Sequence, residues 1–230
     1  MKELKSIIKK IPLLGNVATY IHRKISVVPR FTTSGEYWEN RYKSGGNSGA
    51  GSYNILAEFK AEIINKFVYE RNIETVIEFG SGDGNQLKYF NFNSYVGFDI
   101  SETAIFKCRN LYKSDATKRF EILEAYNEEK ADLVLSLDVI YHIIEDSAYI
   151  DYMGKLFSSS TKYVIIYSSN DDEHENNNVA HHVKHRKFTN WIEQNVSNFK
   201  LIEHIPNKFP FNGNNDISSY ADFYIFQAQD

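Results

Sequence analysis

Cysteine is nearly absent from this chain of 230 residues, in which Cys108 is the single example. One thiol excludes an intrachain disulfide and any metal site built from several thiolates. The chain also lacks a cleavable signal peptide and any apolar run near the roughly 20 residues that a membrane span requires. We therefore expect a cytoplasmic protein.

An excess of positive charge is missing as well. The chain has 26 Lys and Arg against 30 Asp and Glu, a formal net charge of −4. Proteins that grip long nucleic acid usually present a broad basic surface, so we expect no nucleic-acid partner, although a local basic groove stays compatible with these counts. The aromatic fraction is high, at 15%, which indicates dense packing or an aromatic-lined pocket.

Residues 1–33 form a basic amphipathic extension ahead of a single domain over 34–230. Several lysines there alternate with Leu4, Ile7, Ile8 and Ile11, which share one helical face. A helix of this kind binds a membrane surface or a partner, or it packs on its own domain or on a second subunit. We favour packing, with a homodimer possible, because the apolar face is short for stable membrane attachment.

The domain reads as an alternation of helices and strands. Within 34–72, a helix over 36–42 and a second over 53–71 flank a glycine-rich loop containing Gly45, Gly46, Gly49 and Gly51. The core, 73–230, contains five β-rich runs, namely 75–79, 95–100, 120–123, 132–137 and 163–167. Between them lie helical segments at 85–90, 102–112 and 144–157. Near-continuous apolar strands separated by helices indicate a parallel sheet buried on both faces.

The end of the chain breaks this alternation. A helix over 187–195 is followed by strands over 199–205 and 221–228 with no helix between them. Consecutive strands without a crossover helix pair antiparallel. The fold class is therefore α/β, with a Rossmann-like, mostly parallel sheet of seven strands, a terminal antiparallel pair, and helices on both faces.

A glycine-rich turn, Glu78-Phe79-Gly80-Ser81-Gly82-Asp83-Gly84, follows the first strand. Glycine lets the backbone turn sharply and approach a ligand closely. Asp99 ends the second strand, where a carboxylate commonly accepts hydrogen bonds from a ribose diol. A nicotinamide fingerprint would need its third glycine at Asn85, and Glu78 is poorly placed for a pyrophosphate but suits a cationic ligand.

This motif resembles motif I of the class I S-adenosylmethionine-dependent methyltransferases, and the resemblance extends from Tyr37 to Gln227 through the order of strands. It implies S-adenosyl-L-methionine as cofactor. Gly80 and Gly82 would line its methionine portion, and Glu78 would hold its ammonium group directly or through water. At the end of the second strand, Asp99 would accept hydrogen bonds from the ribose hydroxyls, and Ile100 would pack against the adenine.

Two further cofactor residues follow from the resemblance. Glu124 would contact the adenine amino group, although a solvated turn carboxylate explains it equally well. The segment around Tyr37 would cap the cofactor, and the glycine loop would close as a lid. A structural alternative also exists for Asp99, as a helix cap shared with Ser101.

Acceptor residues are expected after the fourth strand, where Asp138, Tyr141 and His142 reach the ligand crevice. Histidine suits the role of general base because its ordinary pKa lies near neutrality, so we expect His142 to act as base. Asp138 would orient the nucleophile and is also expected among the cofactor-binding residues. The prolines that follow this strand in many nucleobase amino-methyltransferases are absent, which agrees with the charge balance.

A second cluster, His181 to Phe188, follows the polar loop 171–178 and has three interpretations. His182 or His185 supplies the base, while Lys184 and Arg186 bind an acidic or phosphorylated acceptor. Alternatively, His181 and His185 bind a divalent metal with help from Asp171 or Asp172. In the third interpretation the cluster is a solvated helix start.

The sequence as a whole resembles bacterial methyltransferases that modify sugars or related surface-polymer precursors. We predict O-methylation of a small polar acceptor, such as a sugar, a nucleotide sugar or a phosphorylated precursor. A nicotinamide-dependent oxidoreductase and a non-catalytic cofactor-binding module are the alternatives.

Overall fold

The computed structural model describes residues 31–172 and 180–229. The chain divides into two units, 1–32 and 33–230, and every element below belongs to the second. The helix predicted near the N-terminus and most of the polar loop 171–178 lie outside the described residues. Within the described residues, no helix has the length and apolar character that crossing a membrane requires.

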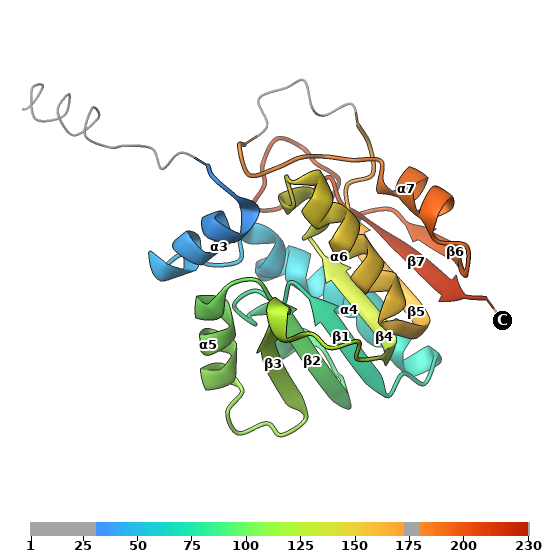
Figure 1. Cartoon of the computed structure of the whole chain (residues 1–230), viewed down its shortest axis with the longest axis horizontal. Helices are drawn as coiled ribbons and strands as arrows, with labels where there is room; N and C mark the ends of the chain where they lie inside the picture. The colour runs from blue at the N-terminus through green and yellow to red at the C-terminus, as the bar shows by residue number, and fades with distance from the viewer. Residues whose placement is uncertain (1–30, 173–179, 230) are drawn as a thin grey trace, which may run out of the picture. The chain divides into compact units, whose positions relative to one another are not determined.

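A seven-stranded sheet organises the described part of the chain, in the order β3-β2-β1-β4-β5-β7-β6 (Figure 1). Its strands are β1 (Thr75–Phe79), β2 (Ser94–Asp99), β3 (Lys118–Ile122), β4 (Ala131–Leu137), β5 (Ser160–Ser168), β6 (Phe199–Ile205) and β7 (Asp222–Ala228). The first five pair in parallel, and β7 runs antiparallel to both β5 and β6. The predicted fold class is confirmed.

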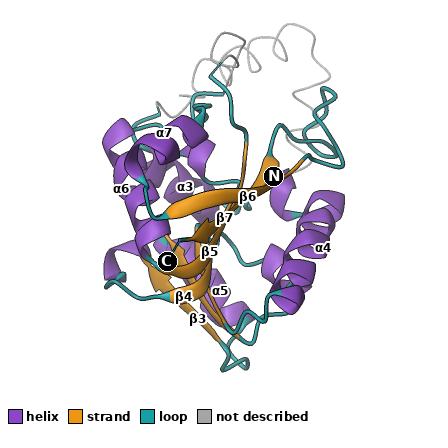
Figure 2. Cartoon of the chain, turned by 90° about the vertical axis from the view of Figure 1, so that its right-hand side faces the viewer, coloured by secondary structure: helices purple, strands orange, loops and turns teal. Residues whose placement is uncertain are grey.

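Helices cover both faces of the sheet. They are α3 (Ser34–Lys43), α4 (Asn54–Glu70), α5 (Glu102–Leu111), α6 (Asp146–Ser158) and α7 (Phe188–Asn195). Apolar side chains of α4 and α5 pack in one core cluster, and those of α6 and α7 pack in another. Figure 2 shows α4 on one side of the sheet and α6 and α7 on the other. Because both faces are covered, the central strands are almost continuously apolar, as in the buried run of β4.

One predicted helix is wrong in type. The segment 85–90 forms only a short 3-10 helix, Gln86–Tyr89. The chain reaches it through glycines with positive φ, and Phe90 and Phe92 are both buried in the core before β2 begins at Ser94. Because Phe90 and Phe92 must both reach the core before β2 begins, the segment between the glycine turn and β2 is too short for successive α-helical turns.

Polar caps define the helices that border the site. The Thr33 side chain accepts a hydrogen bond from the Glu36 N–H at the start of α3, and Ser101 does the same for Ala104 at the start of α5. Since parallel strands share a direction, the carboxyl ends of β1, β2 and β4 meet at one edge of the sheet. Residues with functional chemistry follow all three strands at this edge.

Candidate functional site

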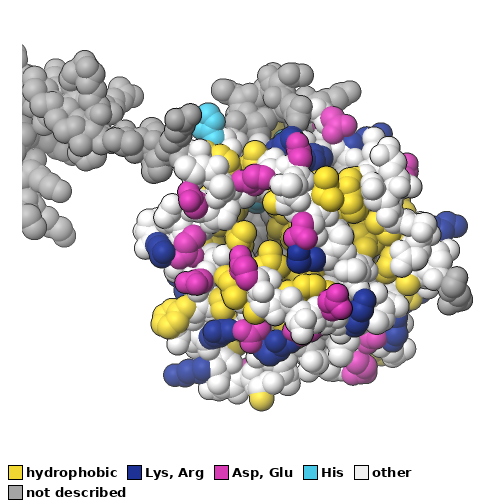
Figure 3. Space-filling view, in the orientation of Figure 1, with side chains coloured by type: hydrophobic (Ala, Val, Ile, Leu, Met, Phe, Trp, Pro, Cys, Tyr) yellow, Lys and Arg dark blue, Asp and Glu magenta, His cyan; other side chains and the backbone are white. Residues whose placement is uncertain are grey.

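A pocket of about 680 Å³ opens at the carboxyl ends of β1, β2 and β4, beneath α3. Figure 3 shows hydrophobic side chains and carboxylates around a hollow on this face of the molecule. Its lining includes Ser34, Gly35, Trp38, Tyr42, Ser48, Ser52, Gly80, Gly82, Asp99, Ile100, Leu123, Glu124, Tyr126, Leu137, Asp138, Val139, His142, Ile143, Glu145, Asp151 and Lys155. A single concave site therefore collects most of the residues predicted from the sequence.

The glycine turn and Asp99 build one wall of this pocket. Gly80 and Gly82 have φ of 87° and 57°, a region that side-chain-bearing residues rarely adopt. The Gly82 N–H donates to Asp99 Oδ2 at 2.8 Å, and the Ser101 N–H donates to Oδ1 at 2.9 Å. Burial raises the pKa of Asp99 to about 6 despite these two donors. Each oxygen keeps a second acceptor site, so the carboxylate can still take a diol.

Asp99 contacts the start of α5 and also faces the pocket, so its predicted contact with a ribose stays a prediction. It supports the start of α5 through the Ser101 N–H, while the Ser101 side chain is the cap itself. It also lines the pocket, as do its neighbour Ile100, which is 44% exposed, and the exposed Glu124.

Glu78 lies away from the pocket lining, which differs from the direct ligand contact expected for it. The side chain is 1% exposed, accepting hydrogen bonds from the Tyr95 hydroxyl at 2.5 Å and the Gln86 amide at 3.0 Å. Burial raises its pKa to about 7. Only the indirect form of the predicted contact, through water, fits this placement.

A cap formed by α3 and the loop 45–52 covers the glycine turn. The Tyr42 hydroxyl lies 2.9 Å from Ser48 Oγ, and both residues line the pocket. Asp83, in the glycine motif, accepts hydrogen bonds from the Ser48 N–H at 3.0 Å and the Tyr53 hydroxyl at 2.8 Å. The cap and the glycine turn are therefore directly bonded to each other.

Two anchors hold α3 in place. Glu39 accepts hydrogen bonds from the hydroxyl groups of Ser101 (2.5 Å) and Thr103 (2.8 Å) at the start of α5. Burial opposes ionisation of Glu39, but these donors and Lys43 lower its pKa to about 2. At the other end, Glu145 accepts from the Ser34 N–H and hydroxyl, each at 2.8 Å.

Tyr37 is not in the lining, contrary to its predicted place against the cofactor. Its ring stacks on His182 with centroids 4.2 Å apart. The next residue, Trp38, lines the pocket instead and meets His142 edge-on at 4.9 Å. Successive side chains of an α-helix point about 100° apart, so Trp38 can face the pocket while Tyr37, one residue earlier, faces His182.

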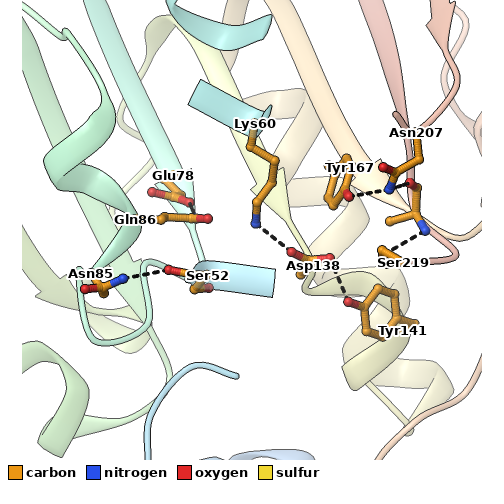
Figure 4. A network of polar contacts seen from close by, with 11 residues as sticks. Ser52, Lys60, Glu78, Asn85, Gln86, Asp138, Tyr141, Tyr167, Asn207 and Ser219 are labelled. Carbon is orange, nitrogen blue, oxygen red and sulfur yellow. Dashed lines mark hydrogen bonds and ion pairs between the residues drawn. The ribbon is translucent and has the colours of Figure 1, made fainter. Parts of the chain in front are cut away.

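Asp138 follows β4 and belongs to the pocket lining, and we call the lining at this end of β4 the pocket floor. Figure 4 shows Asp138 between Lys60 and Tyr141. Its Oδ2 accepts from the Lys60 ammonium at 2.6 Å, and its Oδ1 accepts from the Tyr141 hydroxyl at 2.7 Å. The backbone at Asp138 has a φ of 61°, a strained value for a residue other than glycine. Lys60 is a participant that sequence reasoning missed, since its position in an amphipathic helix reads as an ordinary polar site.

His142 also lines the pocket, from a 3-10 turn after β4 (Ile140–His142). Its Nδ1 lies 3.1 Å from the backbone oxygen of His182. A carbonyl only accepts, so Nδ1 carries the proton and Nε2 keeps its lone pair. Burial lowers the pKa of His142 to about 4, which leaves the ring neutral at pH 7.

The other two candidate bases lie outside the lining. His182 is stacked between Tyr37 and His142, and burial lowers its pKa. His185 is buried, with Nδ1 at 2.6 Å from Ser169 Oγ. The structure thus brings one of the three predicted histidines, His142, to the pocket together with Asp138.

Lys184 and Arg186, predicted to bind an acidic acceptor, are occupied elsewhere. Lys184 Nζ and Arg186 Nη2 lie 2.7 and 2.9 Å from Asp146 Oδ1. Arg186 also donates to the carbonyl oxygens of Ile143 and Ile144, at 2.7 and 3.0 Å. Hydrogen bonds from the two cations lower the pKa of Asp146 to about 2. Through these contacts, Lys184 and Arg186 hold the segment 180–187 against the start of α6.

The metal interpretation fails on geometry. Residues 180–187 are not helical, so His181 and His185 lack the one-turn spacing that a shared metal would need. Among the described residues, no three His, Cys, Asp or Glu side chains are grouped closely enough to hold a metal ion.

The residues of the pocket fit the cofactor that the sequence predicts. A diol acceptor (Asp99), an apolar contact for an adenine (Ile100) and a close backbone approach (Gly80 and Gly82) lie in one lining. Asp138 adds a carboxylate to the same lining, which suits a cationic donor group. No pyrophosphate-binding cation stands beside the glycine turn in this lining.

Comparison with known proteins agrees with this geometry. A family model described as a methyltransferase domain matches residues 53–209. A search of curated proteins finds no match to the chain.

Solved structures share the fold at low sequence identity. N-methyltransferase NodS from Bradyrhizobium japonicum WM9, in complex with S-adenosyl-L-homocysteine, is 12% identical with a TM-score of 0.66, covering 86% of this chain and 100% of its own. Magnesium protoporphyrin IX methyltransferase from Synechocystis PCC 6803 with bound S-adenosylmethionine is 12% identical with a TM-score of 0.61, covering 87% and 99%. A Clostridium acetobutylicum S-adenosylmethionine-dependent methyltransferase is 10% identical with a TM-score of 0.54, covering 74% and 91%.

Proposed function

This chain belongs to the methyltransferase-domain family and is an S-adenosylmethionine-dependent methyltransferase, and we propose that it methylates a hydroxyl group of a small, uncharged, sugar-like acceptor. This family membership disagrees with the two alternatives considered from the sequence, a nicotinamide-dependent oxidoreductase and a non-catalytic cofactor-binding module. The acceptor and the base are the parts that this proposal adds.

His142 carries the proposal. It lines the same pocket as Asp99 and Asp138, and its Nε2 is the unprotonated nitrogen. Held by Gly80, Gly82 and Asp99, the cofactor would supply an electrophilic methyl group, and the carbon–sulfur electron pair would stay on sulfur when the methyl group passes to the acceptor oxygen. The hydroxyl proton becomes strongly acidic as the oxygen gains the methyl group, so a base with a lowered pKa can still accept it at Nε2.

Asp138 is the group that we assign to orienting the hydroxyl. Both of its oxygens already accept one hydrogen bond, from Lys60 and Tyr141, and each can accept another. If Asp138 accepts from a neighbouring hydroxyl of the acceptor, it orients the reacting hydroxyl and leaves the proton of that hydroxyl for His142 Nε2. Positioning of this kind contributes much of the rate in a displacement reaction.

The charges of the lining support an acceptor without phosphate. Within the lining, Lys155 is the single Lys or Arg, and it is paired with Asp151. Because Lys184 and Arg186 are occupied by Asp146, the phosphorylated and nucleotide-linked acceptors considered from the sequence lose their predicted binding groups. We therefore favour a neutral sugar. A cytoplasmic location and a possible homodimer stay predictions from the sequence.

Methyl transfer from labelled S-adenosylmethionine to a panel of acceptors tests the proposal. The panel would contain neutral sugars and glycosides, their phosphates, nucleotide sugars, and amino sugars. We expect label on a hydroxyl of a neutral sugar, abolished in His142→Ala. Transfer confined to amino groups, or to phosphorylated acceptors, would overturn the assignment.

A further inference from the structure

Lys60 is a buried cation next to the pocket residue Asp138. It lies in α4 and is 0% exposed, whereas Lys66, about one and two-thirds turns later in the same helix, has a side chain that is 71% exposed. Burying an ammonium group is costly unless a partner compensates its charge. A buried lysine at position 60 therefore needs a nearby group that offsets the free-energy cost of burying its charge.

The partner of this cation is Asp138. Lys60 Nζ lies 2.6 Å from Asp138 Oδ2 and 5.2 Å from the centre of the Tyr167 ring. The two elements that meet here are 78 residues apart in the chain, and Figure 4 shows the two side chains pointing toward each other. Lys60 itself is absent from the pocket lining, so it reaches the pocket through Asp138.

Asp138 is restrained on several sides. The Tyr141 hydroxyl holds its second oxygen at 2.7 Å, and its own N–H donates to the Tyr167 carbonyl at 2.9 Å. A Cβ placed on Gly51 would fall 2.5 Å from Asp138 Oδ2, so the loop backbone closes against the carboxylate. The carboxylate therefore has one accessible orientation.

We propose that Lys60 is a positioning residue that fixes the Asp138 carboxylate at the pocket floor and balances its charge next to the cationic methyl donor. With Lys60 in place, the pair is neutral. Without Lys60, the floor presents an uncompensated negative charge; without Asp138, it presents a buried positive one. The pair thereby controls how strongly the pocket distinguishes S-adenosylmethionine from S-adenosylhomocysteine, which lacks the sulfonium charge. This inference rests on the cofactor and not on the proposed sugar acceptor.

The test is the ratio of two dissociation constants, measured by calorimetry on the full chain without any acceptor. The ratio is that for S-adenosylhomocysteine divided by that for S-adenosylmethionine. The proteins are wild type, Lys60→Met, Asp138→Asn, and the double variant. Lys66→Met is the matched control, since it makes the same substitution on the exposed face of the same helix.

We expect Lys60→Met to raise the ratio about tenfold, and Asp138→Asn to lower it by a similar factor, the change that about 1.4 kcal/mol produces. The double variant, which removes both charges, should return to within about threefold of wild type. It should also fold best of the three, because it leaves no buried charge unpaired. Lys66→Met should leave the ratio unchanged.

A purely structural role for Lys60 gives a different result. Both dissociation constants would then rise in parallel, and the ratio would stay constant in every variant. That outcome would overturn the proposal. If Lys60→Met alone fails to fold, Asp138→Asn decides the matter, because the proposal lowers its ratio whereas a purely structural role leaves it constant. Because no acceptor is present, failure here is distinguishable from failure of the sugar assignment.

Discussion

The ring of His142 donates its Nδ1 proton to the backbone oxygen of His182, 3.1 Å away. This hydrogen bond selects the tautomer of a pocket-lining histidine through a backbone group rather than a side chain. The identity of residue 182 therefore contributes little to the tautomer, although its ring stacks on His142 at 5.5 Å. Of the histidines proposed from the sequence, His142 lines the pocket and His182 packs against it.

His142→Ala should lower kcat for methyl transfer by about 10²–10⁴, the usual contribution of a general base. Binding of S-adenosylmethionine should persist, measured as the stabilisation of the protein by the ligand. His182→Ala should cost less, since the carbonyl that fixes the tautomer remains. His204→Ala, on β6 beside Asp222 (2.9 Å), is the control. Equal losses in the His142 and His204 variants would contradict a role in proton transfer.

Asp99→Ala should weaken cofactor binding without removing the fold. A ligand at 100 times its dissociation constant stabilises a protein by about 2.7 kcal/mol. We expect wild type to show this rise in melting temperature with S-adenosylmethionine or S-adenosylhomocysteine, and Asp99→Ala to show little of it. NAD should produce no rise in either protein. Retained stabilisation in the variant would mean that the ribose is held elsewhere.

Glu78 should make the protein less stable as the pH rises. Its pKa is about 7 in the folded state, raised by burial from an ordinary 4.5. Between these values the folded state binds more protons than the unfolded state, so the free energy of unfolding falls as pH increases through this window.

Glu78→Gln removes that penalty and should raise the melting temperature more at pH 8 than at pH 5. A difference of about 5 °C corresponds to roughly 2 kcal/mol for a chain of this size. Glu58→Gln, an exposed carboxylate on α4, is the control and should change the melting temperature little. A Glu78→Gln effect that is the same at both pH values would mean that the buried carboxyl does not titrate in this window.

Gly51→Ala should disturb the pocket floor. Its Cβ would lie 2.5 Å from Asp138 Oδ2, so either the loop or the carboxylate must move. We expect weaker binding of S-adenosylmethionine, measured by calorimetry. Gly154→Ala is the matched change: it lies in α6, and its Cβ would meet nothing within 4 Å. It should stabilise the protein by about 0.5–1 kcal/mol. Equal cofactor affinity in the two variants would contradict the close approach of the loop to Asp138.

The order of helices and strands along the chain was predictable because the hydrophobic pattern, the residue composition and the positions of glycines are all properties of short stretches of sequence. Leu133 to Leu137 read as a buried strand, and the missing helix before residue 221 indicated the antiparallel pair. The type of the element at 86–89 was not predictable in the same way. It depends on where Phe90 and Phe92 are buried, which is a tertiary fact.

Within the site, several residues that follow strand ends could be expected in one pocket lining, whereas contacts with distant partners could not be predicted. Asp99, Asp138 and His142 follow strands directly, so topology brings them together. The pairing of Arg186 with Asp146 spans 40 residues and has no local signature. Lys60 was missed for the same reason, because only its contact with Asp138 distinguishes it from a solvated lysine.

The two anchors of α3 have a kinetic consequence. Glu39 ties the helix to the start of α5, and Ser34 ties it to Glu145 at the start of α6. We expect loss of the Glu39 tie, which lies outside the lining, to loosen this helix and to change the rate at which a spent cofactor leaves, without touching either substrate.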